Sequence, residues 1–432
     1  MKILMVCLNF APEPIGVGRY TGDLAQWLAA RGHEVRVITA PPYYPQWRVP
    51  AGYSAWRYQG EWLGRVRLLR CPLPVPPRCS LAGRLGVILS FALTSFLPCL
   101  WQGLRWRPDL VMAFEPTMLA APAALLAARL AGASSCLHVQ DCEIEAALRL
   151  RLLPESRLAS ALRGAYGWLL RRFDLVTTIS QSMRWRLAAC GLEPERISLC
   201  PNWVDTAAIR PETRRSSLRE SLGVAADEVL VLYAGNFGEK QGVASLAEMA
   251  YRLAGRPGIR IALCGAGAAR ARVERRVAHL PNVILLPVQP PERLNELLNL
   301  ADIHVLPLRA SAGDVCFPSK LGGMLASGRP VIALTGPGEL AELLKGRGVV
   351  VGADDGRAAV DAVLRLARKP RLRARLGAAG RAFAEQHLER DRVHARHELQ
   401  LRTILAGTAA AGQGWVFAPT GSPALRPPSP PR

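Results

Sequence analysis

Short apolar runs, separated by helix-like segments, organise the first half of this 432-residue chain. The first run, KILMVCLNF, is continuously apolar, which is typical of a strand buried in a parallel sheet. Tyr20, Leu24 and Leu28 then recur at helical spacing before the apolar run VRVITA. The same alternation continues with PDLVMAF, SSCLHVQ, FDLVTTIS and RISLCPN. Strands separated by helices predict a doubly wound parallel α/β sheet.

A second series of the same kind begins after Asn202, with VLVLYAGN, IRIALCGAG, VILLPV, IHVLPL, PVIAL and GVVVG. The pattern therefore predicts two α/β domains, residues 1–203 and 204–385, that face a ligand-binding cleft. Residues 386–406 are expected to form a helix that packs back on the first domain. Residues 407–432 are rich in Ala, Gly and Pro, a composition that predicts a disordered tail.

The charge and the cysteines narrow the class of protein. The formal net charge is +21, almost all of it from Arg, which favours anionic partners. The arginines are scattered and form no block with interleaved aromatics, so nucleic-acid binding is not expected. None of the ten cysteines forms a CxxC pair, a pattern typical of reduced, buried thiols in the cytoplasm. The first apolar run is also too short for the core of a signal peptide.

The longest uncharged stretch runs from Leu85 to Leu104 and contains Pro98. We interpret it as a buried or membrane-resting helix rather than a span. A basic rim around an apolar surface attracts anionic lipid, so a peripheral position on the inner face of the cytoplasmic membrane is expected. The alternative, buried helices here and at 116–130 with solvated arginines, stays open. The flanking arginines are Arg65, Arg67, Arg70, Arg78, Arg84, Arg105 and Arg107.

A glycine pair, Gly16 and Gly18, stands between the first strand and the first helix. Glycine lets the backbone approach a phosphate, and a helix start adds free N–H donors. A tight turn explains the pair equally well. Thr21 holds the third position of the dinucleotide fingerprint, which counts against a dehydrogenase.

Two further glycine loops follow strands of the second domain. In GNFGEKQG, the loop residues Asn236, Gly238 and Lys240 predict an anion cradle, because a lysine at a helix start opposes the helix dipole unless an anion is bound. Gly265 and Gly267 form a turn after the next strand, at the same edge of the sheet.

A third loop holds Asp314 and leads into Pro318, Ser319 and Lys320, which are predicted to open a helix. Pro in the first turn, Ser beside it and Lys within reach suit a pyrophosphate. The alternative is an ordinary capped helix with a solvated lysine.

Together, RGHEV, PNWVD, GNFGEKQG, LCGAG and PSKLGGMLASGRPVI resemble the retaining nucleotide-sugar glycosyltransferases of the GT-B fold, family 4, and especially exopolysaccharide enzymes of the colanic-acid type. The resemblance extends to about residue 400. It implies two Rossmann-like domains, a donor whose phosphates lie at the two helix starts of the second domain and whose base lies against Val288, and Gly16 and Gly18 closing over the donor. It also implies transfer with retention, without a cofactor or metal, to a growing exopolysaccharide or a lipid-linked saccharide.

The chain departs from the pattern of that family at charged positions. Relatives carry Gly-Arg and then a Lys where this chain has Asn236 and Gln241, with Lys240 displaced by one. The second acid of the later motif is Gly323 here. Lys240 and Lys320 are therefore predicted to neutralise the donor diphosphate together.

In the first domain, Gln140 occupies the slot of a catalytic-side His or Arg, and Asp141 follows it. Asp141 is predicted to contact the acceptor or the sugar, and His138 to lie in the core. No DxD metal motif lies in a suitable loop. Two alternatives stay open: a GT-B epimerase, and a nucleotide-sugar-binding protein without catalysis.

Overall fold

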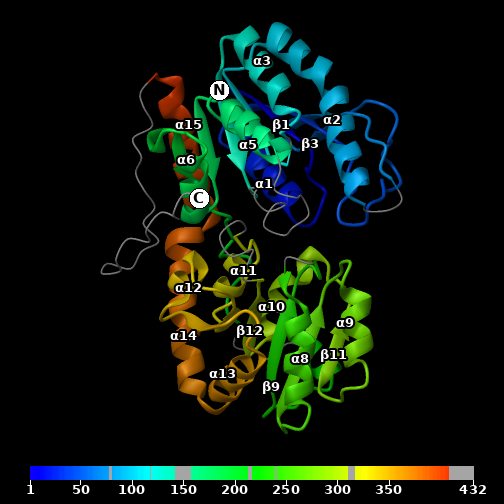
Figure 1. Ribbon diagram of the computed structural model, residues 1–432, viewed down its shortest axis with the longest axis vertical. Coiled ribbons are helices and arrows are strands. Elements are labelled where there is room, and N and C mark those ends of the chain that lie inside the picture. The colour runs from blue at the N-terminus through cyan, green and yellow to red at the C-terminus, as the bar shows by residue number, and fades with distance from the viewer. Residues whose placement is uncertain are drawn as a thin grey trace. The chain divides into compact units, whose positions relative to one another are not determined.

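The computed structural model describes residues 1–76, 80–116, 118–141, 157–212, 217–238, 241–309 and 317–407. Among the described residues, the chain forms two compact units, residues 1–201 with 394–407, and Asn202–Val393 (Figure 1). Each unit has its own sheet, as predicted. The placement of the units in a shared cleft stays a prediction.

The sheet of the first unit has eight strands in the order β3-β4-β2-β1-β5-β6-β7-β8. All neighbours are parallel except the antiparallel hairpin β3–β4. Six strands match the predicted apolar runs, and the hairpin was not predicted. The strands are β1 (Lys2–Cys7), β2 (Glu34–Thr39), β3 (Gln59–Leu63), β4 (Val66–Arg70), β5 (Leu110–Phe114), β6 (Ser134–Val139), β7 (Leu175–Thr178) and β8 (Ile197–Leu199).

Helices connect these strands on both faces of the sheet, and the last helix of the chain returns to this unit. On that last helix, His394 stacks on Trp27 of the first helix with ring centroids 5.1 Å apart. The helices are α1 (Val17–Ala30), α2 (Leu81–Trp101), α3 (Ala121–Ala131), α5 (Arg157–Leu170), α6 (Gln181–Ala189) and α15 (Arg390–Leu405), with the π-helix η1 (Gln102–Trp106) and the 3-10 turn η2 (Pro194–Arg196). None of the described cysteines forms a disulfide.

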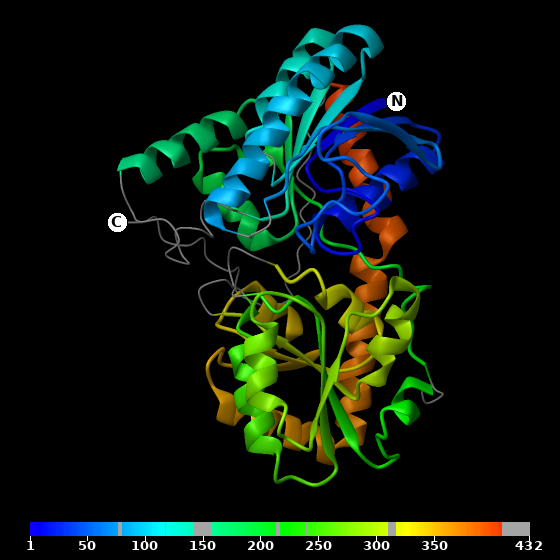
Figure 2. The ribbon, with the colours of Figure 1, turned by 90° about the vertical axis from the view of Figure 1, so that its right-hand side faces the viewer.

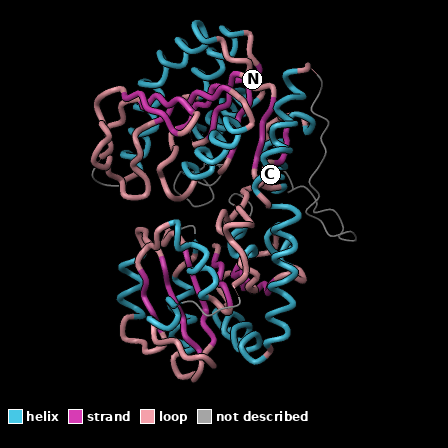
Figure 3. Tube along the Cα trace, turned by 180° about the vertical axis from the view of Figure 1, so that it is seen from behind, coloured by secondary structure: helices cyan, strands magenta, loops and turns pink. Residues whose placement is uncertain are grey.

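The second unit has a fully parallel sheet of six strands in the order β11-β10-β9-β12-β13-β14 (Figure 3). All six runs predicted for this domain form its strands: β9 (Val229–Ala234), β10 (Ile259–Cys264), β11 (Val283–Leu286), β12 (Ile303–Pro307), β13 (Val331–Leu334) and β14 (Gly348–Val351). The helices are α7 (Ser217–Ser221), α8 (Ala244–Leu253), α9 (Arg270–Val277), α10 (Leu294–Leu300), α11 (Leu321–Ala326), α12 (Glu339–Leu344), α13 (Gly356–Arg368) and α14 (Pro370–Phe383), with η4 (Pro291–Arg293) and η6 (Ala384–Leu388).

The strand order of the second unit reverses next to β9. From β9 the chain moves outward through β10 and β11, and it then returns to the other side of β9 as β12. Ligands of open α/β sheets bind at such a switch point, outside the carboxyl ends of the strands. The loops after β9 and β10, and the segment that opens α11, meet at this edge.

Candidate active site

The loops after β9 and β10 are joined by backbone hydrogen bonds beyond the ends of the strands. The N–H of Gly235 donates to the Cys264 carbonyl at 2.9 Å, and the N–H of Phe237 donates to Ala266 at 2.8 Å. The N–H of Ala269 donates back to Phe237 at 2.9 Å. The two predicted turns therefore form one rigid platform.

Glycine is required where these loops touch. A Cβ on Gly265 would overlap the carbonyl oxygen of Gly235, and one on Gly267 would overlap the Asn236 side chain. Both Gly265 and Gly267 have φ +142°, which L side chains rarely adopt. A Cβ on Gly238 would also lie 3.2 Å from Asn236 Nδ2. These glycines bring two backbones into contact and leave the sheet edge open.

Lys320 lies against this platform. It is the N-cap residue of α11, and Pro318 and Ser319 form a turn before the helix, closed by the 3.1 Å bond from the Leu321 N–H to the Pro318 carbonyl. The prediction that Pro318 stands in the first helical turn is therefore wrong: Pro318 begins a turn that leads into α11 at Leu321. The Lys320 Nζ lies 4.2 Å from the ring centroid of Tyr233. It would be only 2.9 Å from a Cβ on Gly235.

The environment of Lys320 is unusual for a lysine. The residue as a whole is half-buried, but its Nζ is inaccessible to solvent and has no acceptor among the described residues. Burial lowers the pKa of Lys320 from 10.5 to about 7. The alternative interpretation, in which Lys320 is solvated, is thus wrong. A buried ammonium without a counter-ion is unstable, so the arrangement favours a bound anion.

Two residues that shape this edge were missed. The Tyr233 hydroxyl donates to the Asn236 carbonyl at 2.6 Å, and the Tyr233 ring makes a cation–π contact with Lys320. Arg270 donates to the carbonyls of Gly265 and Leu286, the latter at 2.7 Å, and pairs with Glu274. Tyr233 could have been identified from the sequence, because it interrupts an aliphatic run just before a glycine. Arg270 is hidden in an arginine-rich segment.

The other predicted donor residues are placed as follows. Val288 follows β11 and is 55% exposed, so its side chain is available to a ligand. Ser319 is exposed beside Lys320. Lys240 and Asp314 lie outside the described residues. In the part of the chain that the structure describes, no three His, Cys, Asp or Glu side chains converge on a possible metal position. Transfer without a metal stays a prediction.

The glycine pair of the first unit lies above a buried carboxylate. Glu13 Oε1 accepts the N–H groups of Tyr43 and Tyr44 at 3.1 and 3.0 Å, and Oε2 accepts Asn9 Nδ2 at 2.9 Å. Burial raises the pKa of Glu13 to about 6. A Cβ on Gly18 would lie 2.5 Å from Glu13 Oε2. Gly18 is therefore required by packing, which favours the tight-turn interpretation.

Gly16 is the N-cap of α1, with φ +68°. No side chain caps this helix, and its first turn holds no acidic residue. The helix start therefore has no cap of its own, but the Glu13 carboxylate near Gly18 offsets part of its positive character.

The strand end that carries Asp141 is held by a polar network. His138 Nδ1 lies 2.8 Å from Thr177 Oγ1, and its Nε2 accepts the Gln140 amide at 2.9 Å. Burial lowers the pKa of His138 to about 3, so the ring is neutral. His138 is a core residue, as predicted. Asp141 is half-buried and directly follows this network.

Comparisons with known proteins agree with this geometry. Residues 16–203 match a glycosyl transferase 4-like domain, and residues 228–369 match glycosyl transferases group 1. A protein of Escherichia coli (strain K12), provisionally named colanic acid biosynthesis glycosyl transferase WcaI, is 38% identical over 407 residues, covering 91% of this chain and 98% of that protein. The chain belongs to this glycosyltransferase family.

Solved structures show the same fold. Sucrose-phosphate synthase from Thermosynechococcus elongatus aligns with a TM-score of 0.75 at 17% identity, over 94% of this chain and 100% of that one. HepE from Anabaena, in complex with UDP-glucose, aligns with a TM-score of 0.66 at 17% identity, over 94% and 100%. The fold of this glycosyltransferase is therefore GT-B.

This glycosyltransferase also lacks a carboxylate at Gly323, on the helix that Lys320 opens. A Cβ on Gly323 would meet the Leu298 side chain at 3.3 Å, so little room is left there.

Proposed function

We propose that this glycosyltransferase binds a nucleotide-diphosphate sugar at the carboxyl edge of the second unit's sheet, with its diphosphate beside Lys320. The observation that carries the proposal is the Lys320 Nζ, which is buried, lacks an acceptor among the described residues and lies against the Gly235 turn. The proposed donor, a nucleotide sugar, carries a diphosphate, and HepE has been solved with UDP-glucose bound to the same fold. Val288 is the proposed contact of the base.

The leaving diphosphate would be stabilised by protein cations, Lys320 and, with it, Lys240. Positive charge fixed before the reaction begins costs no reorganisation as charge develops, which is the main source of such catalysis. We propose transfer with retention and without a metal, and Asp141 as the contact to acceptor or sugar. These roles rest on the resemblance to the family.

Thermal stabilisation by a panel of nucleotide sugars tests donor binding. One donor should raise the melting temperature of the wild type, and Lys320→Ala should abolish the shift. Equal shifts in both proteins would reject the site. Hydrolysis of the stabilising donor then separates a transferase from a protein that binds without turnover, and inversion of a single stereocentre in the recovered nucleotide sugar would indicate an epimerase.

We propose that the acceptor is a lipid-linked saccharide in the cytoplasmic membrane, and that the enzyme binds the membrane surface through the outer face of α2. This helix packs through Val87, Phe91 and Cys99, which are at most 1% exposed. In Figure 2, α2 lies along the side of the first unit that faces the viewer. On the helix side opposite its packed residues, Leu93 is 69% and Leu97 71% exposed. We define the outer face of α2 as Leu85, Leu89, Leu93, Phe96, Leu97 and Trp101.

The stretch Ala82–Trp106 is long and apolar enough to cross a bilayer, but its buried side belongs to the unit's own core. A helix that is apolar on both sides and covered on one fits a bilayer surface.

The basic rim is smaller than predicted. Arg70 is 1% exposed, pairs with Glu61 and donates to the carbonyls of Ala11 and Ala40, so it is a core residue. Arg78 lies outside the described residues. The other five predicted arginines are exposed: Arg65, Arg67, Arg84, Arg105 and Arg107. Arg84 lies on α2, and Arg105 follows it and stacks on Trp101 at 5.2 Å. Such cations contribute about 1 kcal/mol each at an anionic membrane.

Flotation with anionic liposomes tests this surface. Burying one leucine contributes about 1.5–3 kcal/mol, so Leu93→Ser with Leu97→Ser should weaken binding by about 100-fold or more. The control is Tyr251→Ser with Leu399→Ser, two residues that are also exposed and lie outside this face. Wild-type protein that stays soluble at low and high salt would refute the membrane proposal and leave the transferase proposal intact.

A further inference from the structure

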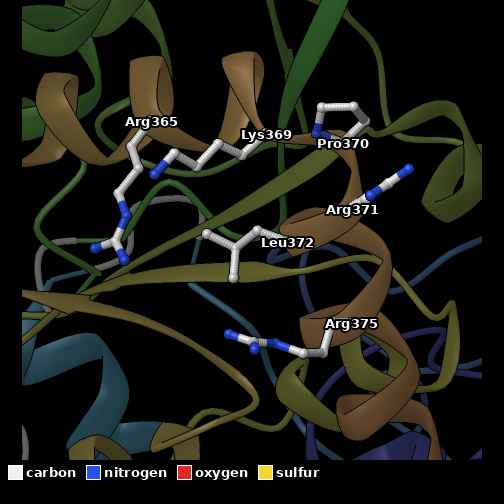
Figure 4. Close-up of a pocket in the computed structure, with 6 residues that line it drawn as sticks. All are labelled: Arg365, Lys369, Pro370, Arg371, Leu372 and Arg375. Carbon is white, nitrogen blue, oxygen red and sulfur yellow. The ribbon is translucent and has the colours of Figure 1, made fainter.

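A basic pocket lies where α13 meets α14, away from the donor loops. Its volume is about 590 Å³, within the usual range for small-molecule sites. Leu372 and Pro370 form its apolar lining, and the remaining lining residues are Arg365, Lys369, Arg371 and Arg375. In Figure 4, Arg365, Lys369 and Arg375 extend toward the side on which Leu372 lies, whereas Arg371 points away. Several cations therefore share one concavity.

These cations are not neutralised within the described residues. No acidic residue stands between Asp361 and Glu385 in the sequence. Elsewhere in this unit, arginines commonly pair with carboxylates, as Arg219 does with Asp302 and Arg252 with Glu248. The basic composition of the chain alone does not explain the contrast.

Helix electrostatics explains only some of the charges. Arg365 lies in the last turn of α13, where the helix dipole favours a cation. Arg373 donates to the carbonyls of Leu366 and Ala367, both at 2.7 Å, and so caps α13. Arg371, however, stands in the first turn of α14, which has no side-chain cap and no acidic residue. The Arg371 side chain points away from the pocket, so the charges that face it are those of Arg365, Lys369 and Arg375, and a bound anion would relieve their mutual repulsion.

The pocket is distinct from the donor site. α13 follows β14 and packs on β13 and β14, so it runs back from the carboxyl edge of the sheet toward the amino edge. Its junction with α14 thus lies at the opposite end of the unit from α11, as Figure 1 shows.

We propose that this pocket binds a soluble, multivalent phosphate, the diphosphate or polyphosphate group of a small molecule, as a second anion site on the enzyme. Three cations around a concave, partly apolar pocket match a ligand with several phosphate charges better than a single monovalent ion.

Calorimetric titration of the full chain with sodium tripolyphosphate tests the proposal. The wild type should bind saturably, and binding should weaken as salt rises. Arg365→Ala with Arg375→Ala, two side chains that extend toward the pocket, should weaken it by about tenfold or more, since each lost contact is charge-assisted. The matched control, Arg357→Ala with Arg368→Ala, removes the same charge from exposed positions outside the pocket and should change affinity by less than about twofold.

The other outcomes overturn the proposal. Equal weakening in both double variants would show a general charge effect, and loss of binding in Lys320→Met would assign the phosphate to the donor site. An absence of saturable binding to wild type, or binding only to vesicles of anionic phospholipid, would also reject a soluble ligand. Melting temperatures that do not fall below that of the wild type show that the variants fold.

Discussion

Replacing Lys320 by Met is the most informative perturbation of the proposed donor site, because it should move stability and binding in opposite directions. Methionine keeps most of the side-chain volume and removes the charge. The lowering of the Lys320 pKa from 10.5 to about 7 corresponds to about 5 kcal/mol against the ammonium form in the folded protein. The unfolded chain has no such penalty.

The sign of the stability change follows from proton linkage. The folded pKa lies below that of the unfolded chain, so the unfolded state holds more protons between about pH 7 and 10.5. Stability therefore rises with pH across this window. Lys320→Met removes the penalty and should raise the free energy of unfolding at pH 7 by about 2–4 kcal/mol.

Donor binding should change the other way. A diphosphate beside Nζ stabilises the ammonium and returns its pKa toward the ordinary value. At pH 8 the wild type should then take up close to one proton on binding, and its affinity should fall as pH rises above 7. Loss of the charge-assisted contact in Lys320→Met should weaken binding by about 10- to 100-fold.

Calorimetry at pH 8 in buffers of different ionisation enthalpy measures the proton uptake directly. A nucleotide sugar is the suitable ligand, because its diphosphate does not titrate near neutrality. The reasoning is refuted if wild type and Lys320→Met bind equally tightly, or if the wild type takes up no proton. Lowered stability of the variant would show that the cation is paired in the free enzyme.

Three further outcomes are expected. Gly265→Ala should cost more than about 2 kcal/mol of stability and abolish donor binding, because its Cβ overlaps Gly235, whereas Gly255→Ala, which has open space, should be neutral in both denaturation and titration. Burial lowers the pKa of His138 to about 3 and that of His397 to about 4, so the unfolded state binds more protons than the folded state below pH 6.5. Denaturation curves should therefore show a loss of about 2 kcal/mol of stability per histidine between pH 7 and 5. A denaturation midpoint that does not change with pH would contradict this. EDTA should leave transfer intact, and activity lost with EDTA and restored by magnesium would contradict metal-free transfer.

The central strands were predictable because each is a continuous apolar run. Burial on both faces of a parallel sheet requires that pattern, and the alternation with helices then defines the doubly wound sheets. The hairpin β3–β4 was not predicted because its first strand, QGEWL, is not a continuous apolar run. This strand lies at the sheet edge, alternates partly buried with exposed positions and includes Glu61. Arg70 was assigned to the surface from its charge. Its burial depends on carbonyls of Ala11 and Ala40, which are remote in the sequence.

The site was predictable where it depends on backbone shape. Gly265 and Gly267 stand out in sequence because loops in contact exclude a Cβ. The burial of Lys320 was not predictable, because it is created by Tyr233, some 90 positions earlier, on a strand that only the fold brings alongside. Glu13 escaped because a charged residue between two prolines reads as solvent-exposed loop.

The Tyr233–Lys320 contact explains why the site tolerates an unstable lysine. An aspartate beside Nζ would stabilise the free enzyme, but a diphosphate would then have to displace a carboxylate of the same charge. A tyrosine ring attracts the cation more weakly, by about 0.5–2 kcal/mol, and holds it in place without competing for the diphosphate oxygens. Gly323, on the same helix, supplies no carboxylate either. In the proposed complex, the free energy that Lys320 withholds from folding would become available on anion binding, so the buried cation and the aromatic ring would act together in binding.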